Sequence, residues 1–234
     1  MEYILRAKNI IKDYGNGKKA LNGFNLDIES GKIVGLLGNN GSGKTTFMKM
    51  AAGILRKTSG EIEICGHEPD IYTKSIVSYL PDANYLYEWM KVKDAVRFFE
   101  EFYKDFDAKK ARELLGIMEL DGQQKISSLS KGMVEKLNLT LVLSRNAKLY
   151  MLDEPLGAVD PVARDKILNV IIDNFSNDSS MLVTTHLVSD IERLFDSIAF
   201  IKEGKIVLFD DAENLRSKYG ESINELYKEV LQNV

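Results

Sequence analysis

Residues 32–46, KIVGLLGNNGSGKTT, constrain the fold more than any other part of the chain. The apolar run matches a strand buried on both faces, and the glycine-rich stretch leads into a helical pattern over residues 45–55. Between them, residues 38–45 have the spacing glycine, four residues, glycine, lysine and serine or threonine. A strand, a tight loop and a helix in this order are typical of one unit of a parallel α/β sheet.

The rest of the chain extends this α/β pattern. The runs KLYMLDE and SMLVTTH are also nearly continuous apolar strands, whereas LNGFNLDI alternates as a strand with one wet face does. The strand-like runs are residues 21–28, 32–37, 61–65, 76–80, 149–153, 181–185, 198–202 and 205–209. We therefore expect an α/β fold with a mostly parallel sheet and an added antiparallel β part.

Helical patterns replace strand signals from about residue 85 to 145, with VKDAVRFFEEFYKDF, DAKKARELLGIME and MVEKLNLTLVLS in succession. We interpret residues 85–145 as a helical subdomain inserted into a single domain that spans residues 1–234. Residues 211–234 form a predicted C-terminal helical extension. Its apolar residues at helical spacing are Ile223, Leu226, Tyr227, Val230, Leu231 and Val234. Such a stripe packs on its own domain or lies on a membrane, and the acidic polar side disfavours the membrane.

The composition excludes several classes of protein. The 234 residues are 44% hydrophobic and 28% charged, as in a globular chain of one or two domains. The formal net charge of −4 gives no electrostatic reason to expect nucleic acid. Cys65 is the single cysteine, and no segment approaches the ~20 apolar residues that cross a bilayer. We expect a cytoplasmic protein that is neither exported nor membrane-spanning.

The glycine-rich loop has the chemistry to hold a polyphosphate. Its glycines let successive backbone N–H groups turn inward around the phosphates, and the helix that follows presents its positive end to them. Lys44 is placed to reach the β- and γ-phosphates, and the hydroxyl of Thr45 is a ligand that Mg²⁺ accepts. An accidental match in a glycine-rich turn is disfavoured by the flanking strand and helix. The loop is predicted to bind a nucleoside triphosphate.

A second motif supplies carboxylates for hydrolysis. The apolar strand in KLYMLDEP ends in Asp153, which Glu154 and Pro155 follow. Functional groups gather at such carboxyl ends of parallel strands. We expect Asp153 to hold Mg²⁺ through water and Glu154 to act as the general base that polarises the attacking water. Two acidic turn residues that merely cap a strand are the alternative, and the phosphate loop disfavours it.

Between these two motifs, LSKGM at residues 129–133 precedes a helical pattern at residues 134–143. This tract resembles the LSGGQ signature of the ATP-binding cassette family, and the resemblance covers nearly the whole chain in order. Cassettes of that family pair head to tail. The resemblance implies that Ser130 and Gly132 of one cassette close on the γ-phosphate held by a second cassette. A serine-rich helix start is the alternative for this tract alone.

The resemblance also implies roles for other residues. It assigns the nucleotide to Gly38, Asn39, Asn40, Gly41, Ser42, Gly43, Lys44, Thr45 and Thr46. It places Asp160 of PLGAVD against the opposing cassette, although Asp160 is also a good helix N-cap before Pro161. His186 resembles the switch histidine that contacts the γ-phosphate; the alternative is a purely structural role. Tyr14 resembles the aromatic residue that stacks on adenine; the alternative is an exposed tyrosine in a turn with no such role.

Two departures from the family pattern affect what can be carried over. Asp82 stands where the family has a glutamine, and a carboxylate there can ligate the cation directly or bind a basic coupling group. The signature carries Lys131 and Met133 in place of a glycine and the glutamine. Such changes sometimes mark one half of an asymmetric pair. The loop lysine, both carboxylates of LDE and the switch histidine are intact, so the chain's own nucleotide should be hydrolysed.

The aromatic residues Tyr85, Tyr87 and Trp89 follow Asp82 closely. In a transporter cassette this region receives the coupling helix of the membrane subunit, and packing within the helical insertion is the alternative. We expect a single-cassette ATPase that hydrolyses MgATP and drives a separately encoded membrane permease from the cytoplasmic face. The resemblance is to exporters of drugs, peptides or antibiotics.

Two other classes of function remain at this stage. The first is a non-transport cassette ATPase that acts on a soluble partner in DNA repair, translation or cluster assembly. The sequence has neither the second phosphate loop nor the long coiled coil that some of those proteins need. The second is a kinase or GTPase; on this interpretation SLSKGM and His186 would match the cassette family only by chance.

Overall fold

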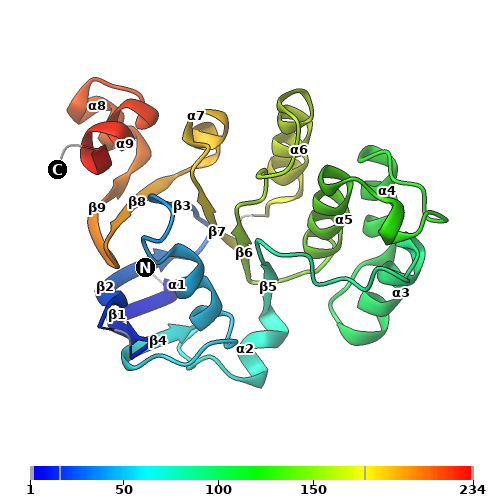
Figure 1. Cartoon of the computed structure of the whole chain (residues 1–234), viewed down its shortest axis with the longest axis horizontal. Coiled ribbons are helices and arrows are strands. Elements are labelled where there is room, and N and C mark those ends of the chain that lie inside the picture. Colours follow the sequence, from blue (N-terminus) through cyan, green and yellow to red (C-terminus); the bar gives the residue numbers. More distant parts are fainter. Residues whose placement is uncertain (1–2, 16, 177, 233–234) are drawn as a thin grey trace.

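The computed structural model describes residues 3–15, 17–176 and 178–232, and in this part of the chain the strands form a three-stranded and a six-stranded sheet (Figure 1). The smaller sheet is antiparallel, in the order β2-β1-β4. Its strands are β1 (Tyr3–Asp13), β2 (Lys19–Glu29) and β4 (Ser59–Ile64). This sheet is the predicted antiparallel part.

The larger sheet has the order β5-β6-β7-β3-β8-β9, and all its pairs are parallel except β8 with β9. Its strands are β3 (Ile33–Leu37), β5 (Val77–Leu80), β6 (Leu149–Asp153), β7 (Ser180–Thr185), β8 (Ser197–Lys202) and β9 (Lys205–Asp211). Every residue of β3, β6 and β7 is buried. The predicted α/β fold class is therefore confirmed, with its central strands buried on both faces.

Helices lie between most of the strands of the larger sheet and after the last one. They are α1 (Lys44–Ala51), α2 (Ile71–Ile76), α3 (Val92–Phe102), α4 (Ala108–Ile117), α5 (Lys131–Leu143), α6 (Pro161–Asn174), α7 (Val188–Ile191), α8 (Ala212–Tyr219) and α9 (Ile223–Gln232), with short 3₁₀ turns at Ile126–Ser128 and Glu192–Leu194. Figure 1 shows α3, α4 and α5 on one side of the molecule, with the larger sheet between them and β1, β2 and β4.

The larger sheet separates two hydrophobic cores. Along β3, Ile33 and Leu37 face one core, while Val34 and Leu36 face the other, because successive side chains of a strand point to opposite faces. The first core includes residues of α3 to α7 and of the C-terminal helices. The second includes α1 and the inner face of the antiparallel sheet. Both faces of the strands that carry the site are thus fixed by packing.

Arg145 joins the helical segment to the edge of the larger sheet. This buried guanidinium donates to the carbonyl of Val77 at 2.6 Å and to that of Ser75 at 2.8 Å. It also pairs with Asp105 at 3.1 Å and lies over the ring of Tyr103. The helices α3, α4 and α5 lie within residues 85–145. Their treatment as an inserted subdomain of a single domain 1–234 remains our interpretation.

One strand and several boundaries differ from the prediction. Strand β1 was not predicted, because register shifts and a positive φ of 52° at Asn9 interrupt the alternation of its side chains. Ile76 ends α2 and does not begin β5. Helix α1 ends at Ala51, four residues before the predicted end, and α5 begins at Lys131.

The C-terminal residues 211–232 contain α8 and α9, which lie beside β8, β9 and α7 (Figure 1). Ile223, Leu226 and Leu231 are buried in the first core. The predicted apolar stripe therefore packs on its own domain, while Val234 lies outside the described residues. Among the helices described, none has the length and apolar character needed to cross a membrane.

Candidate active site

A cleft of about 750 Å³ opens at the carboxyl ends of β3, β5, β6 and β7. The phosphate loop and the start of α1 form one wall, and α5 contributes to the other. Of the residues predicted from the sequence, those that line the cleft are Asn40, Gly41, Gly43, Lys44, Thr45, Thr46, Asp82, Asp153, Glu154 and His186. The parallel topology thus brings together groups that are far apart in the sequence.

Two positions of the phosphate loop admit only glycine. A Cβ at Gly38 would lie 2.5 Å from the carbonyl oxygen of Ile201, closer than real Cβ contacts. Gly43 has a φ of 113°, and its Cβ would lie 2.6 Å from the carbonyl oxygen of Ala20. Gly43 is also the N-cap of α1, and no side chain caps this helix start within the described residues. The first N–H groups of α1 therefore suit an anion.

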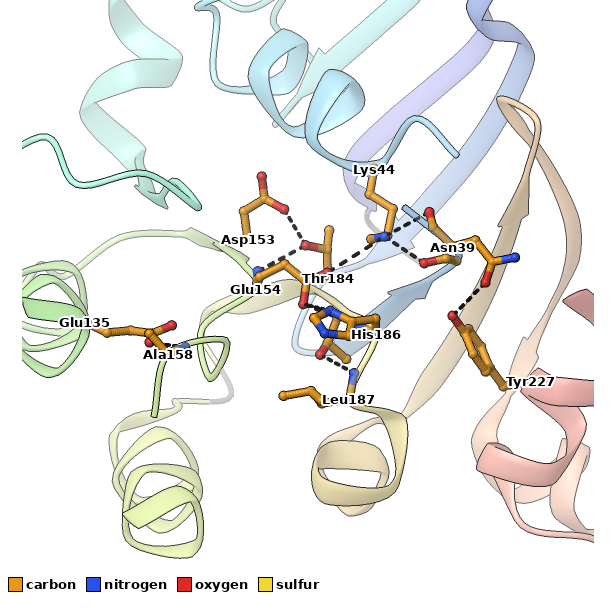
Figure 2. A network of polar contacts seen from close by, with 12 residues as sticks. Asn39, Lys44, Glu135, Asp153, Glu154, Ala158, Thr184, His186, Leu187 and Tyr227 are labelled. Carbon is orange, nitrogen blue, oxygen red and sulfur yellow. Dashed lines mark hydrogen bonds and ion pairs between the residues drawn. The ribbon is translucent and has the colours of Figure 1, made fainter. Parts of the chain in front are cut away.

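Lys44 is buried beneath the loop that it follows. Its Nζ donates to the carbonyl of Gly38 at 2.7 Å and to that of Asn39 at 3.3 Å, and lies 3.8 Å from Glu154 Oε1 (Figure 2). Burial lowers the pKa of Lys44, and the nearby charges of Glu154, Asp153 and Asp82 act in the opposite direction. The ammonium group lacks full compensation for its lost hydration, so phosphate oxygens are suitable further partners.

The carboxylate of Asp153 is buried and only partly satisfied. Thr184 Oγ1 donates to Asp153 Oδ1 at 2.5 Å. The other oxygen, Oδ2, is buried and accepts no hydrogen bond among the described residues. Burial, and next the negative charge of Asp153, raise the pKa of the Tyr79 hydroxyl. A buried carboxylate oxygen without a donor fits a cation.

Asp82 adds a second carboxylate to the same cleft. Partial burial, and next the negative charge of Asp153, raise the pKa of Asp82, so the charge of Asp153 disfavours ionisation of Asp82. A cation between them would relieve this repulsion. Among the described residues no group of three or more His, Cys, Asp and Glu gathers as a metal site. Mg²⁺, which takes one or two carboxylates plus phosphate and water, needs no such group.

Glu154 is held in a strained backbone conformation beside His186. Its φ is 53°, which is uncommon for a residue with a side chain, and its N–H donates to the carbonyl of Thr184 at 3.0 Å. Glu154 Oε2 accepts the backbone N–H of His186 at 3.2 Å and lies 2.9 Å from His186 Nδ1 (Figure 2). The carboxylate is thereby oriented at the cleft, as a general base must be.

The remaining predicted residues do not line this cleft. Ser130 accepts the N–H of Met133 at 3.2 Å and caps α5, while Asp160 accepts the N–H of Ala163 at 3.0 Å and caps α6. Both side chains are exposed. Gly38, Asn39 and Ser42 belong to the loop but lie outside the cleft lining. Tyr14 is 55% exposed beyond β1, with Lys12 Nζ 4.9 Å from its ring centroid.

Glu135 on α5 was not predicted from the sequence; it lines the cleft and contacts the segment after Glu154. Glu135 Oε2 accepts the N–H of Ala158 at 2.7 Å (Figure 2). A Cβ on Gly132 would lie 3.1 Å from the carbonyl oxygen of Ala158. The first turn of α5 therefore packs closely on residues 157–159. An acidic side chain within a largely apolar helix was the available signal.

Burial raises the pKa of Glu135, against hydrogen bonds from Ala158 and Gly157 that favour its ionised form. A raised folded-state pKa gives stability that is complete below the ordinary value and is lost as pH rises through the folded pKa. Glu135→Gln removes this loss, so relative to wild type its unfolding free energy should increase between pH 4 and 7. Glu135→Ala removes the acceptor and should cost about 1–3 kcal/mol. Urea denaturation at several pH values measures both, with the exposed Glu100→Gln as the control.

Known proteins share sequence with this chain over most of its length. A family model described as ABC transporter matches residues 21–157, more than half of the chain. The ABC transporter ATP-binding protein YtrB of Bacillus subtilis (strain 168) is 33% identical over 87% of this chain and 71% of its own length. The lantibiotic transport ATP-binding protein SrtF of Streptococcus pyogenes is 30% identical over 94% of this chain and 97% of its own length.

The fold is also shared with solved structures. An ATP-binding subunit of an ABC transporter superposes with a TM-score of 0.86 at 25% identity, covering 97% of this chain and 98% of that one. The dimeric ABC transporter cassette MJ0796 superposes with a TM-score of 0.80 at 23% identity, covering 88% and 98%. The match to the family model and to relatives over most of their length decides the question: the chain belongs to the ABC transporter family and is one of its ATP-binding, ATP-hydrolysing cassettes.

Proposed function

We propose that this cassette powers a separately encoded membrane permease, that it works in export, and that the cleft of Lys44, Asp153, Glu154 and His186 is where it hydrolyses MgATP. The observation that carries the proposal is the placement of Glu154 between Lys44 and His186 at the mouth of the phosphate loop. A role in transport is supported by SrtF, whose name assigns it to lantibiotic transport; export is what the resemblance to exporters implies.

In the proposed reaction, the N–H groups at the start of α1 and the ammonium of Lys44 bind the phosphates of ATP. Glu154 accepts a proton from the water whose oxygen attacks the γ-phosphorus, and the bond to the β-phosphate oxygen breaks to release ADP and phosphate. His186 holds the Glu154 carboxylate through Nδ1 and its backbone N–H. The residues of this chain mainly position the reactants and stabilise charge.

Asp153, Thr45 and Asp82 are the residues that would hold Mg²⁺ in this proposal. The donor-free Oδ2 of Asp153 and the exposed carboxylate of Asp82 supply oxygen ligands of the kind that this cation prefers. When bound, Mg²⁺ would neutralise charge on the β- and γ-phosphates. Tyr14 would stack on the adenine, for which its exposed ring leaves one face accessible.

A second cassette completes the site in this proposal. The exposed Ser130, the start of α5 and the exposed Asp160 lie at the surface, where a second chain placed head to tail can reach them. Their N-cap bonds are within the chain and leave the outward faces of both side chains accessible. Lys131, also exposed, adds positive charge next to the bound phosphates of the partner cassette.

The proposed permease contact is the aromatic surface formed by Tyr85, Tyr87 and Trp89. Trp89 is 70% exposed, Tyr87 is 60% exposed, and their rings stack at a centroid distance of 5.7 Å. These residues follow Asp82 of the cleft directly, so a segment bound there lies next to the nucleotide. Exposed aromatic groups of this kind are enriched where one protein docks on another.

Membrane association of the tagged chain in its own cells tests this proposal. We expect wild type in the membrane fraction together with one integral membrane protein, and Trp89→Ala mainly in the soluble fraction with its ATPase fold intact. Val207→Ala on β9, also exposed, is the control and should remain with the membranes. A wild-type chain that is wholly soluble and pairs with a soluble protein would favour the non-transport class instead.

A further inference from the structure

Helix α9 contacts the phosphate loop, although the two residues that meet lie 188 positions apart. Tyr227 Oη donates to Asn39 Oδ1 at 3.2 Å (Figure 2). Asn39 is the second residue of the loop, and its carbonyl accepts from Ser42 N–H at 3.1 Å and from Lys44 Nζ at 3.3 Å. The hydroxyl therefore reaches a residue whose backbone already organises the loop.

Tyr227 is partly buried and packs against the first core. The ring lies 6.2 Å from that of Phe200, which is fully buried on β8. Phe200 pairs in register with Leu37, the last residue of β3 before the loop begins. On the helix itself, Ile223 and Leu226 are buried in the first core. The packing of α9 on the first core therefore positions the Tyr227 hydroxyl at the loop.

One helical turn further along α9, a second residue of the helix faces the same region. Leu231 lines a cavity of about 600 Å³ together with Asn39, Asn40 and Ser42. Residues four apart lie on the same face of a helix, so Tyr227 and Leu231 present one face of α9 to the loop. Burial, and next the charge of Glu154, raise the pKa of Tyr227 further above neutral pH.

We propose that Tyr227 is a positioning residue for the phosphate loop and couples the C-terminal helix α9 to nucleotide binding. The inference rests on the proposed role of residues 38–45 in holding the nucleotide. Coupling between two sites is reciprocal. If the bond to Asn39 favours the conformation that accepts phosphate, then nucleotide binding must in turn stabilise α9.

Tyr227→Phe removes the hydroxyl and keeps the ring on Phe200. By calorimetry, ADP should bind roughly 2- to 10-fold more weakly, as expected for one ordinary hydrogen bond. The KM for ATP should rise while kcat stays within about twofold, because the hydroxyl does not touch the reacting atoms. Tyr219→Phe on α8, an exposed tyrosine that contacts Lys218, is the matched control and should bind ADP as wild type does.

Two further measurements separate positioning from general stability. Combined with Asn39→Ala, Tyr227→Phe should cause no additional loss of ADP affinity, because both changes remove the same bond. In wild type, ADP should slow amide exchange in residues 223–232, and in Tyr227→Phe this slowing should disappear. Unchanged or tighter ADP binding in Tyr227→Phe, additive losses in the double variant, or no slowing in wild type would each overturn the inference. Failure of the nucleotide assignment is recognised separately, by ADP binding that survives Lys44→Ala.

Discussion

Replacing Lys44 by Ala is expected to lower MgATP hydrolysis by at least about 100-fold, because a preorganised positive charge at the phosphates is lost. The fold should persist. Burial lowers the pKa of Lys44 despite three nearby carboxylates, which means that the folded protein gains no net stability from this charge. Phosphate release and circular dichroism of the same preparation measure the two effects.

The matched control for Lys44→Ala is Lys49→Ala, an exposed lysine in the last turn of the same helix. It should hydrolyse ATP close to the wild-type rate. This result would show that the position of the Lys44 charge matters, and not merely the loss of one positive charge. Wild-type turnover in Lys44→Ala would refute the assignment of residues 38–45 as the phosphate loop.

Glu154→Gln should bind ATP and hydrolyse it about 10²–10⁴-fold more slowly than wild type, because the amide keeps the size of the side chain but cannot accept a proton. The contact with the backbone N–H of His186 uses Oε2, and the amide oxygen of glutamine can also accept this hydrogen bond. Steady-state phosphate release gives the rate, and calorimetry gives the affinity. A loss of both together would indicate that Glu154 shapes the site without acting as the base.

The same variant also tests the second cassette. With turnover blocked, ATP should hold a head-to-tail pair closed, so light scattering should give a dimer in ATP and a monomer in ADP. Ser130→Ala in this background should weaken the dimer, because the exposed Ser130 is proposed to contact the partner's γ-phosphate. A dimer that forms only after a different cassette is added would indicate an asymmetric pair, in line with Lys131 and Met133 of the signature.

Short sequence motifs predicted those parts of the site that consist of a single strand and the loop after it. Glycine spacing located the phosphate loop, and an apolar run ending in Asp153 and Glu154 located the carboxylates, since in parallel sheets such ends meet at one edge. The match to the ABC transporter family model bears out the family to which these motifs pointed. The alternation of β3 between two cores explains why its sequence is apolar throughout.

Contacts between segments that are distant along the chain could not be predicted from the sequence. The bond from Tyr227 to Asn39 and the bond from Ala158 to Glu135 each depend on how separate elements pack. In the sequence Tyr227 was only one apolar position of a helical stripe. Strand β1 escaped because its irregular register and the positive φ of Asn9 obscure the period of two that identifies strands.

The chemical identity of the nucleotide bound after incubation with MgATP tests most directly whether this cleft hydrolyses ATP with Glu154 as its base. Wild type and Glu154→Gln are incubated with ATP, separated from free nucleotide and denatured, and the released nucleotide is resolved by chromatography. We expect ADP from wild type, intact ATP from Glu154→Gln, and little or no bound nucleotide from Lys44→Ala. ADP formed by Glu154→Gln at the wild-type rate would contradict the claim that this cleft hydrolyses ATP with Glu154 as its base.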